Sequence, residues 1–263
     1  MNKIKLGNIF VGNDLQPYFI ADLAANHDGE LSRAKELVWL AKESGAHCAK
    51  FQHFVADKIV NDVEFQKINS LKTHQSGWKG SVSEIYDQYH FKREWTEEVV
   101  KECKKAEIEF STSPYDYDAV ELVDEFVNFY KIGSGDISWI DFIQYVAKKN
   151  KPILIATGAS TIDDVQRAVE IVDRKKLVLM QCNTNYTVET DKHKFVNLRV
   201  LEQYKKLFPD VVLGLSDHTL GHGSVLGATA LGARVFEKHF TDDNNRIGPD
   251  PVSYTHLTLP TKA

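Results

Sequence analysis

Lysine and histidine side chains occur at or just after short apolar runs at four points of this 263-residue sequence. Lys50 and Lys131 lie within such runs, and His218 and His239 lie at the ends of two later ones. Ammonium groups bind phosphates and carboxylates as point charges, whereas imidazoles carry protons or bind metals. The spacing 239 − 218 = 21 residues equals about one strand-plus-helix repeat. We therefore expect both imidazoles to face one cavity, although each histidine alone is more often a structural residue.

Eight apolar runs alternate with amphipathic segments along the chain. The predicted strands are residues 19–24, 48–52, 108–113, 129–133, 152–157, 177–182, 211–216 and 235–239. The predicted helices include residues 31–44, 94–106, 118–127, 162–172 and 197–207, with Ser160 or Thr161 as the cap of the fourth. Nearly continuous apolar runs are typical of strands covered on both faces. Eight such repeats predict an α/β fold of the (β/α)8 TIM-barrel type, with a doubly wound open sheet as the alternative.

Polar residues gather at the ends of the predicted strands, where a barrel binds its substrates. They are Asp22, Asn26, His27, Lys50, Gln52, Thr112, Lys131, Ser134, Asp136, Thr157, Tyr186, Ser216, Asp217, His218, Glu237, Lys238 and His239. Packing of an apolar core does not require such a ring of charges, hydroxyls and imidazoles. The ring therefore predicts an enzyme site at this end of the barrel.

Composition excludes several other classes of protein. The formal net charge is −5 with no basic stripe, which argues against nucleic acid as a partner. No signal-peptide core and no run of about 18 apolar residues occurs, so we expect a cytoplasmic protein that does not enter a membrane. The three widely spaced cysteines predict small buried side chains in a reducing compartment.

The stretch 53–90 is the longest interruption of the strand and helix pattern, and it follows the second strand. In a barrel it lies on the catalytic face, so it predicts a lid or a sugar-contacting loop. A partly helical excursion on the surface is an equally good interpretation.

The strand ends resemble the sialic acid synthase family, in the family's order and over roughly residues 18–250. The matching segments are Ile20-Ala21-Asp22-Leu23-Ala24-Ala25-Asn26-His27-Asp28-Gly29, Lys50-Phe51-Gln52, Tyr130-Lys131-Ile132-Gly133-Ser134-Gly135-Asp136, Ala156-Thr157-Gly158, Gly214-Leu215-Ser216-Asp217-His218-Thr219, Glu237-Lys238-His239-Phe240-Thr241 and Gly248-Pro249-Asp250. The resemblance implies condensation of phosphoenolpyruvate with an amino-sugar aldehyde similar to N-acetylmannosamine. The products would be a nonulosonic, sialic-type acid and phosphate.

Roles for the polar residues follow from charge and from this resemblance. Lys50 and Lys131, with Ser134 and Ser216, are expected to hold the anionic groups of phosphoenolpyruvate. By resemblance, His218 and His239 bind a divalent metal, Mn²⁺ or else Mg²⁺. Asp22 and Asp136 stand where relatives usually have glutamate, and they are candidates for proton transfer and charge stabilisation. The expected substrate contacts are Gln52, Thr112, Tyr186 and Asp250.

Each of these roles has an alternative. One lysine could instead form an internal ion pair with a carboxylate of the barrel, although pairing of both lysines is not expected. Asp22 or Asp136 could be that partner. At the level of function, the alternatives are another phosphoenolpyruvate–aldose synthase, such as the class that makes 3-deoxy-octulosonate phosphate, and a catalytically inactive barrel.

The C-terminal segment departs from the family. Residues 1–250 form the expected barrel domain, but Pro251 stands where relatives have histidine, and residues 251–263 do not resemble the family. We expect this tail to be an artefact, the barrel to lack its last outer helix, and the family's antifreeze-like domain to be absent. The resemblance implies a homodimer for the full-length form.

Overall fold

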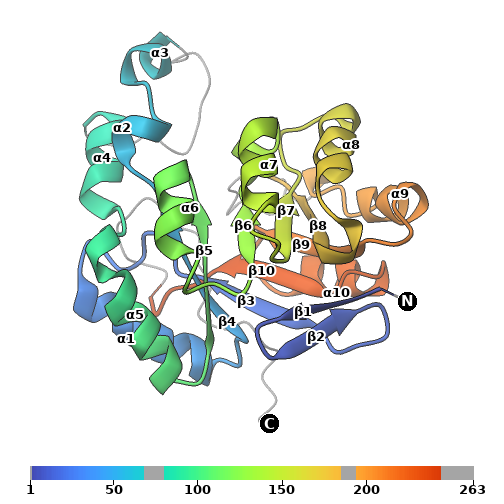
Figure 1. Cartoon of the computed structure of the whole chain (residues 1–263), viewed down its shortest axis with the longest axis horizontal. Helices are drawn as coiled ribbons and strands as arrows, with labels where there is room; N and C mark the ends of the chain where they lie inside the picture. The colour runs from blue at the N-terminus through green and yellow to red at the C-terminus, as the bar shows by residue number, and fades with distance from the viewer. Residues whose placement is uncertain (1, 68–79, 185–193, 244–263) are drawn as a thin grey trace.

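Helices surround a central sheet in the computed structural model, which describes residues 2–67, 80–184 and 194–243 (Figure 1). The strands are β1 Lys3–Leu6, β2 Ile9–Gly12, β3 Tyr18–Asp22, β4 Cys48–His53, β5 Glu109–Pro114, β6 Tyr130–Ile132, β7 Ile153–Ala156, β8 Leu177–Cys182, β9 Val212–Asp217 and β10 Val235–His239. The helices are α1 Leu31–Glu43, α2 Ala56–Ile59, α3 Asp62–Lys67, α4 Val82–Tyr89, α5 Thr96–Lys105, α6 Tyr117–Val123, α7 Ile140–Ala147, α8 Ile162–Ile171, α9 Val200–Leu207 and α10 Gly223–Ala230.

The central sheet is a nearly closed barrel of eight strands in the order β5-β4-β3-β10-β9-β8-β7-β6. All its ladders are parallel, and the last strand, β10, pairs with the first, β3, so that His239 lies opposite Asp22. At the remaining seam the Ser111 hydroxyl of β5 donates to the Phe129 carbonyl just before β6, at 3.1 Å. The predicted (β/α)8 barrel is confirmed. The doubly wound open sheet is wrong, because the last barrel strand, β10, pairs with the first barrel strand, β3.

The five predicted helices are present as α1, α5, α6, α8 and α9. Thr161 caps α8 in a capping box, in which its hydroxyl accepts from the Asp164 N–H and the Asp164 carboxylate accepts from the Thr161 N–H. Two outer helices, α7 and α10, went unpredicted. The α10 segment contains two glycines and no charged residue, so it lacks the polar face by which a surface helix is recognised.

An N-terminal hairpin, also unpredicted, closes the amino end of the barrel. Strands β1 and β2 pair antiparallel, and on β1 every second side chain is buried, which places Ile4 and Leu6 on the inner face. Together with Val11 they pack into one apolar cluster with side chains from inside the barrel, among them Tyr18 and Phe129. The hairpin thus seals one end of the barrel and leaves the other end for chemistry.

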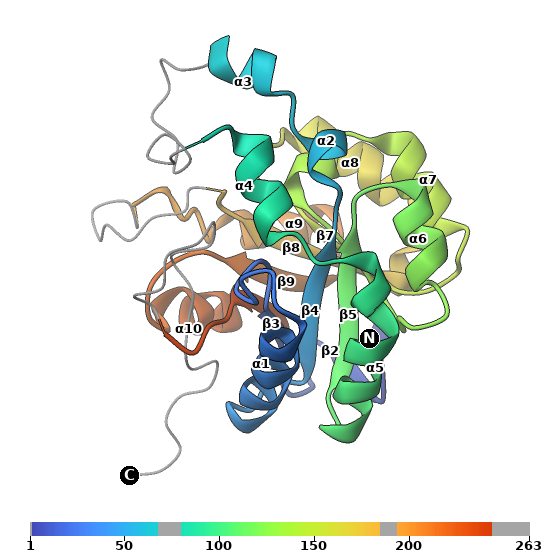
Figure 2. The same ribbon diagram turned by 90° about the vertical axis from the view of Figure 1, so that its left-hand side faces the viewer.

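The stretch after β4 rises over the carboxyl ends of the strands as α2, α3 and α4 (Figure 2). Its base is tied to the barrel by the Asp116 carboxylate, which accepts from Lys58 at 3.0 Å and from Arg93 at 2.7 Å. Residues of α2 and α4 also line the cavity described below. The described part of this stretch is therefore partly helical and borders the cavity, while its function as a lid or a sugar-contacting loop stays a prediction.

Other predictions have mixed outcomes. Cys48, Cys103 and Cys182 are buried free thiols, as predicted. In the part of the chain that the structure describes, no helix has the length and apolar character needed to cross a bilayer. The tail at 251–263 and the segment that would hold a last outer helix lie outside the described residues.

The hairpin generates a stability prediction. Leu6→Ala is expected to lower the free energy of unfolding by about 2–5 kcal/mol, because it leaves a cavity beneath the barrel. Lys5→Ala, on the exposed face of the same strand, should change it by less than about 0.5 kcal/mol. Chemical denaturation followed by circular dichroism measures both. Equal losses would show that the hairpin does not plug the barrel.

Candidate active site

A cavity of about 720 Å³ opens at the carboxyl ends of the barrel strands. Nine of the residues to which the sequence assigned a role line it: Asp22, Lys50, Gln52, Lys131, Ser134, Asp136, Ser216, His218 and His239. They meet because side chains alternate along a strand, so residues two apart on one strand both face the barrel axis. Asp22 follows Ile20 in this way on β3, and Gln52 follows Lys50 on β4.

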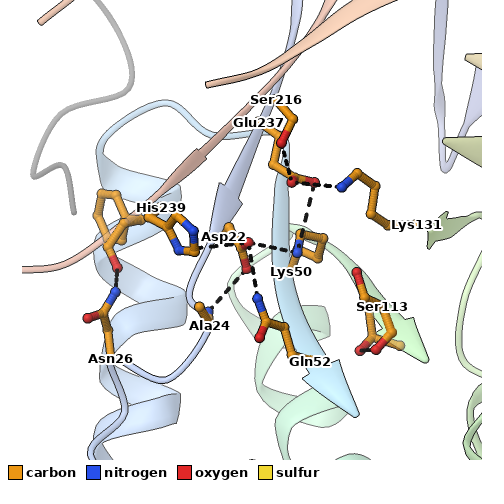
Figure 3. A network of polar contacts seen from close by, with 12 residues as sticks. Asp22, Ala24, Asn26, Lys50, Gln52, Ser113, Lys131, Ser216, Glu237 and His239 are labelled. Atoms are coloured by element: carbon orange, nitrogen blue, oxygen red, sulfur yellow. Dashed lines mark hydrogen bonds and ion pairs between the residues drawn. The ribbon is translucent and has the colours of Figure 1, made fainter. Parts of the chain in front are cut away.

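Two ion pairs form the floor of the cavity (Figure 3). The Lys50 ammonium lies 2.8 Å from a carboxylate oxygen of Asp22, and the Lys131 ammonium lies 3.0 Å from one of Glu237. Lys50 is also 3.9 Å from the second oxygen of Glu237, which links the pairs into one network. All four side chains are at most 5% exposed. Charges buried so deeply are tolerated only when each has a partner.

The network determines the charge state of its members. Burial alone would raise the pKa of Glu237, but the ammonium groups of Lys131 and Lys50 lower that pKa to about 2. Burial disfavours the charged form of Lys50, yet Asp22 and Glu237 outweigh it and raise the lysine pKa. The Ser216 hydroxyl also donates to Glu237, at 3.1 Å. The carboxylate of Glu237 and the ammonium of Lys50 are therefore charged across the physiological pH range.

One sequence expectation is corrected here. Internal pairing of both lysines was not expected, but Lys50 pairs with Asp22 and Lys131 pairs with Glu237. Glu237 was among the strand-end residues but had no assigned role. Its position two residues before His239 on the same strand was the signal that could have placed it in the cavity.

Asp22 connects the network to the histidines. One of its oxygens accepts from the Ala24 backbone N–H at 3.2 Å, and the other is 3.4 Å from the Gln52 amide nitrogen. The same second oxygen lies 3.8 Å from Nδ1 of His239 (Figure 3). Asp22 therefore holds Lys50 on one side and borders an imidazole on the other.

The two predicted metal ligands lie next to each other. The rings of His218 and His239 have centroids 5.3 Å apart, and both line the cavity. Nδ1 of His218 is 3.0 Å from the Asn183 carbonyl, which can only accept, so this nitrogen carries the proton in that contact. Neutral histidines that bind metals through the other ring nitrogen are commonly oriented in this way. The donor set thus fits a divalent ion.

Within residues 2–67, 80–184 and 194–243, no three or more His, Cys, Asp or Glu side chains form a cage for a metal. The described part of the site therefore offers two imidazole nitrogens, and the other positions of an ion are left to water, substrate or residues outside these ranges. Coordination positions that the protein does not fill are a requirement of a catalytic metal site.

Residues 37–258 match the model of the NeuB family. This chain belongs to the NeuB family. It is 33% identical over 248 residues to human N-acetylneuraminate-9-phosphate synthase, covering 92% of this chain and 66% of that protein. It is also 33% identical over 237 residues to N,N'-diacetyllegionaminic acid synthase of Campylobacter jejuni, covering 88% of this chain and 69% of that protein. The chain thus spans about two thirds of the length of these relatives.

Solved structures agree with this family assignment. The N-acetylneuraminic acid (sialic acid) synthetase of Leptospira borgpetersenii superposes with a TM-score of 0.83 at 25% identity, covering 96% of this chain and 83% of that one. A truncated 3-deoxy-D-arabino-heptulosonate 7-phosphate synthase from Thermotoga maritima superposes with a TM-score of 0.68 at 14% identity and shares the fold.

The predicted residue Asp136 of this NeuB-family cavity is an unusual acid. It belongs to the turn Ser134–Asp136 after β6, where Ser134 accepts from the Gly158 backbone N–H at 3.0 Å. Burial raises the pKa of Asp136 to about 6, and Lys131 opposes this only in part. An acid with a pKa near neutrality can both release and accept a proton at the pH of a cell.

Thr112 is a further correction, because its side chain faces away from the cavity. Its hydroxyl lies 2.8 Å from Nδ1 of His53, whose Nε2 lies 2.9 Å from the Thr96 hydroxyl at the start of α5. Burial lowers the pKa of His53 to about 3, so this ring is neutral. The alternation of β5 puts the next residue, Ser113, on the cavity instead. Thr112 is thus a packing residue, not a substrate contact.

Thr157 also lies in the outer layer, where its hydroxyl accepts from that of Tyr204 on α9, at 2.9 Å. The predicted contacts Tyr186 and Asp250 lie outside the described residues. Several cavity residues had no individual role assigned from the sequence. Lys58, Asn61 and Tyr86 belong to the stretch 53–90, which was predicted only as a whole to lie on the catalytic face, whereas Tyr115 and Trp139 follow β5 and β6 and had no prediction.

Thr112→Val tests the outward placement. Removing the hydroxyl leaves a buried His53 nitrogen without its partner, so the free energy of unfolding should fall by about 1–3 kcal/mol. Ser113→Ala, the neighbouring change on the cavity side, is the control and should cost less. Thermal and chemical denaturation compare the two. A larger loss for Ser113→Ala would reverse the assignment of the two faces.

Proposed function

We propose that this NeuB-family barrel condenses phosphoenolpyruvate with an amino-sugar aldehyde, giving a nonulosonic acid and phosphate. One observation carries the proposal: two ammonium groups, an acid of raised pKa and two adjacent imidazoles line a single cavity. The names of the relatives, synthases of N-acetylneuraminate 9-phosphate and of diacetyllegionaminic acid, support the class of product.

Lys50 and Lys131 are proposed to bind the phosphate and carboxylate of phosphoenolpyruvate. An ammonium group has three N–H donors, so pairing with one carboxylate leaves capacity for an entering anion. Asp22 and Glu237 keep the two lysines in place before the substrate arrives. Ser134 and Ser216, whose hydroxyls lie at the same cavity, are proposed to add neutral donors. Such preorganised charge is the main source of rate acceleration in many enzymes.

The acceptor sugar is proposed to occupy the outer part of the cavity. Tyr86, Tyr115 and Trp139 line it there, and the Trp139 ring stacks on Phe142 with centroids 4.6 Å apart. Aromatic rings of this kind combine a large apolar face with a polar edge, which suits a sugar that presents both C–H and O–H groups. Gln52 and Asn61 also line the cavity, where their side-chain amides can donate hydrogen bonds to sugar hydroxyls or accept hydrogen bonds from them.

His218 and His239 are proposed to hold a divalent metal, Mn²⁺ or Mg²⁺. A bound ion of this type supplies Lewis acidity toward the aldehyde oxygen. Asp22 borders His239 and Lys50 at once, so its carboxylate can stabilise positive charge that develops at C2 of the enol ester.

The proposed reaction requires two protons to be moved. A bond forms between C3 of phosphoenolpyruvate and the aldehyde carbon, and water then adds at C2 before the C–O bond to phosphate breaks. Of the two protons of that water, one ends on the former aldehyde oxygen and one leaves with phosphate. Asp136 is proposed to take the proton from water, because its pKa of about 6 leaves it ionised yet basic at neutral pH.

The direct test is phosphate release in the presence of phosphoenolpyruvate, Mn²⁺ and a panel of sugars that includes N-acetylmannosamine and its 6-phosphate. The expected result is sugar-dependent release of one phosphate per nonulosonic acid, detected by mass spectrometry.

Lys131→Ala should raise KM for phosphoenolpyruvate by about tenfold or more, because it removes a charge-assisted contact worth about 1.5–3 kcal/mol.

Three results would each contradict a part of the proposal. No release with any sugar of the panel would remove the amino-sugar synthase function. Release with arabinose 5-phosphate alone would instead favour the 3-deoxy-octulosonate phosphate class. Activity of Lys131→Ala equal to that of the unaltered protein would exclude that lysine from binding the anion.

The role of Asp136 predicts a pH dependence. Its ionised form is the base, so kcat/KM should fall as the pH drops below about 6, and by about tenfold for each further unit. Asp136→Asn should lower kcat and abolish this limb of the profile. A profile of Asp136→Asn that keeps the same acid limb would assign the ionisation to another group.

A further inference from the structure

A third buried ion pair lies on the outer face of the barrel, next to the two histidines in the sequence. Lys238 of β10 stands opposite Asp217 of β9 in the parallel ladder, and the Lys238 ammonium contacts the Asp217 carboxylate. The two side chains are 3% and 1% exposed. Asp217 immediately precedes His218, and Lys238 immediately precedes His239. Each member of the pair is therefore the immediate sequence neighbour of a histidine that lines the cavity.

The pair holds the backbone on both sides of His218. Asp217 accepts from the Thr219 N–H at 3.0 Å and from the Thr219 hydroxyl at 2.8 Å. Lys238 donates to the Thr219 carbonyl at 2.8 Å as well as to Asp217. The residues before and after His218 are thus joined to each other and to the neighbouring strand.

The backbone beyond His239 is held by a separate set of contacts. The Phe240 N–H donates to the Asp22 carbonyl at 2.8 Å, and the Asn26 side chain donates to the Phe240 carbonyl at 2.9 Å (Figure 3). With Lys238 on the other side, His239 is also held from both directions. Besides the backbone ladder of β9 and β10, the two histidine segments are linked through the side chains of Lys238, Asp217 and Thr219.

Stability alone does not explain an ion pair at this place. Replacing a buried ion pair by apolar side chains of similar volume is often neutral or stabilising. What apolar side chains cannot reproduce is the direction of four contacts that converge on residues 217, 219 and 238. A directional link of this kind determines where the flanked side chains lie.

We propose that Asp217 and Lys238 are positioning residues that set the spacing of the His218 and His239 imidazoles for a divalent ion. The inference rests on the proposed role of the two histidines as metal ligands. Neither residue touches the ion or the substrate, because both face the outer layer of the barrel. Loss of groups that orient metal ligands typically weakens metal affinity by about 10- to 100-fold.

The test compares Mn²⁺ affinity with stability in the same proteins. The double variant Asp217→Leu/Lys238→Met removes both charges at once and so avoids a lone buried charge. Asp217→Asn keeps the shape of the side chain and serves as the second variant where the double variant does not fold. Free Mn²⁺ is measured by electron paramagnetic resonance during titration of metal-free protein, and thermal unfolding is recorded in parallel.

Thr112→Val is the matched control. It also removes a buried polar contact from the outer face of the barrel, but this contact is with His53 and lies on β5, away from His218 and His239. We expect Mn²⁺ to bind about 10- to 100-fold more weakly to Asp217→Leu/Lys238→Met and to Asp217→Asn than to the unaltered protein. The Mn²⁺ affinity of Thr112→Val should equal that of the unaltered protein. Unaltered affinity in a folded Asp217 or Lys238 variant, or equal weakening in the control, would overturn the inference while leaving the proposed function intact. Absence of Mn²⁺ binding to the unaltered protein would instead overturn the metal role, and this inference with it.

Discussion

The linked ion pairs Lys50–Asp22 and Lys131–Glu237 are the constraint on which the site depends. Buried ammonium groups are unfavourable unless carboxylates face them, and these four side chains come from four different strands. Only a closed arrangement of β3, β4, β6 and β10 brings them within contact distance. Closure of the barrel and charge balance of its floor are therefore one requirement, which the N-terminal hairpin supports by sealing the opposite end.

Strand alternation then separates two layers of polar chemistry. The inner layer of β9 and β10 presents Ser216 and Glu237, whereas the outer layer of the same strands carries Asp217 and Lys238. A shift of one residue in either strand would exchange the layers of that strand and turn its member of the outer pair toward the cavity. The short Ser-Asp-His and Glu-Lys-His segments thus each serve both faces of the barrel. This double use explains why three consecutive polar residues occur at a buried strand end.

The NeuB family assignment and the cavity both support the proposed chemistry. Two relatives that are 33% identical to this chain over the aligned residues are named N-acetylneuraminate-9-phosphate synthase and N,N'-diacetyllegionaminic acid synthase. The shorter acids Asp22 and Asp136 still reach the cavity, where Asp22 contacts Lys50 and Asp136 has a pKa near neutrality. The short side chain of aspartate therefore suffices to place both carboxyl groups at the site.

The sequence by itself determined the eight strands, five of the helices and nine cavity residues, because continuous apolar runs and polar strand ends are local patterns. It did not reveal the hairpin plug, the helices α7 and α10, or the aromatic wall around Trp139. The hairpin strands have only four residues each, α10 lacks a polar face, and the wall gathers side chains from separate segments. Only the tertiary structure decided which way each side chain faces. It turned Thr112 outward to His53 and brought Glu237 inward between two lysines. The reason is physical: facing depends on strand register across the closed barrel, and register is a property of neighbouring strands and not of one segment.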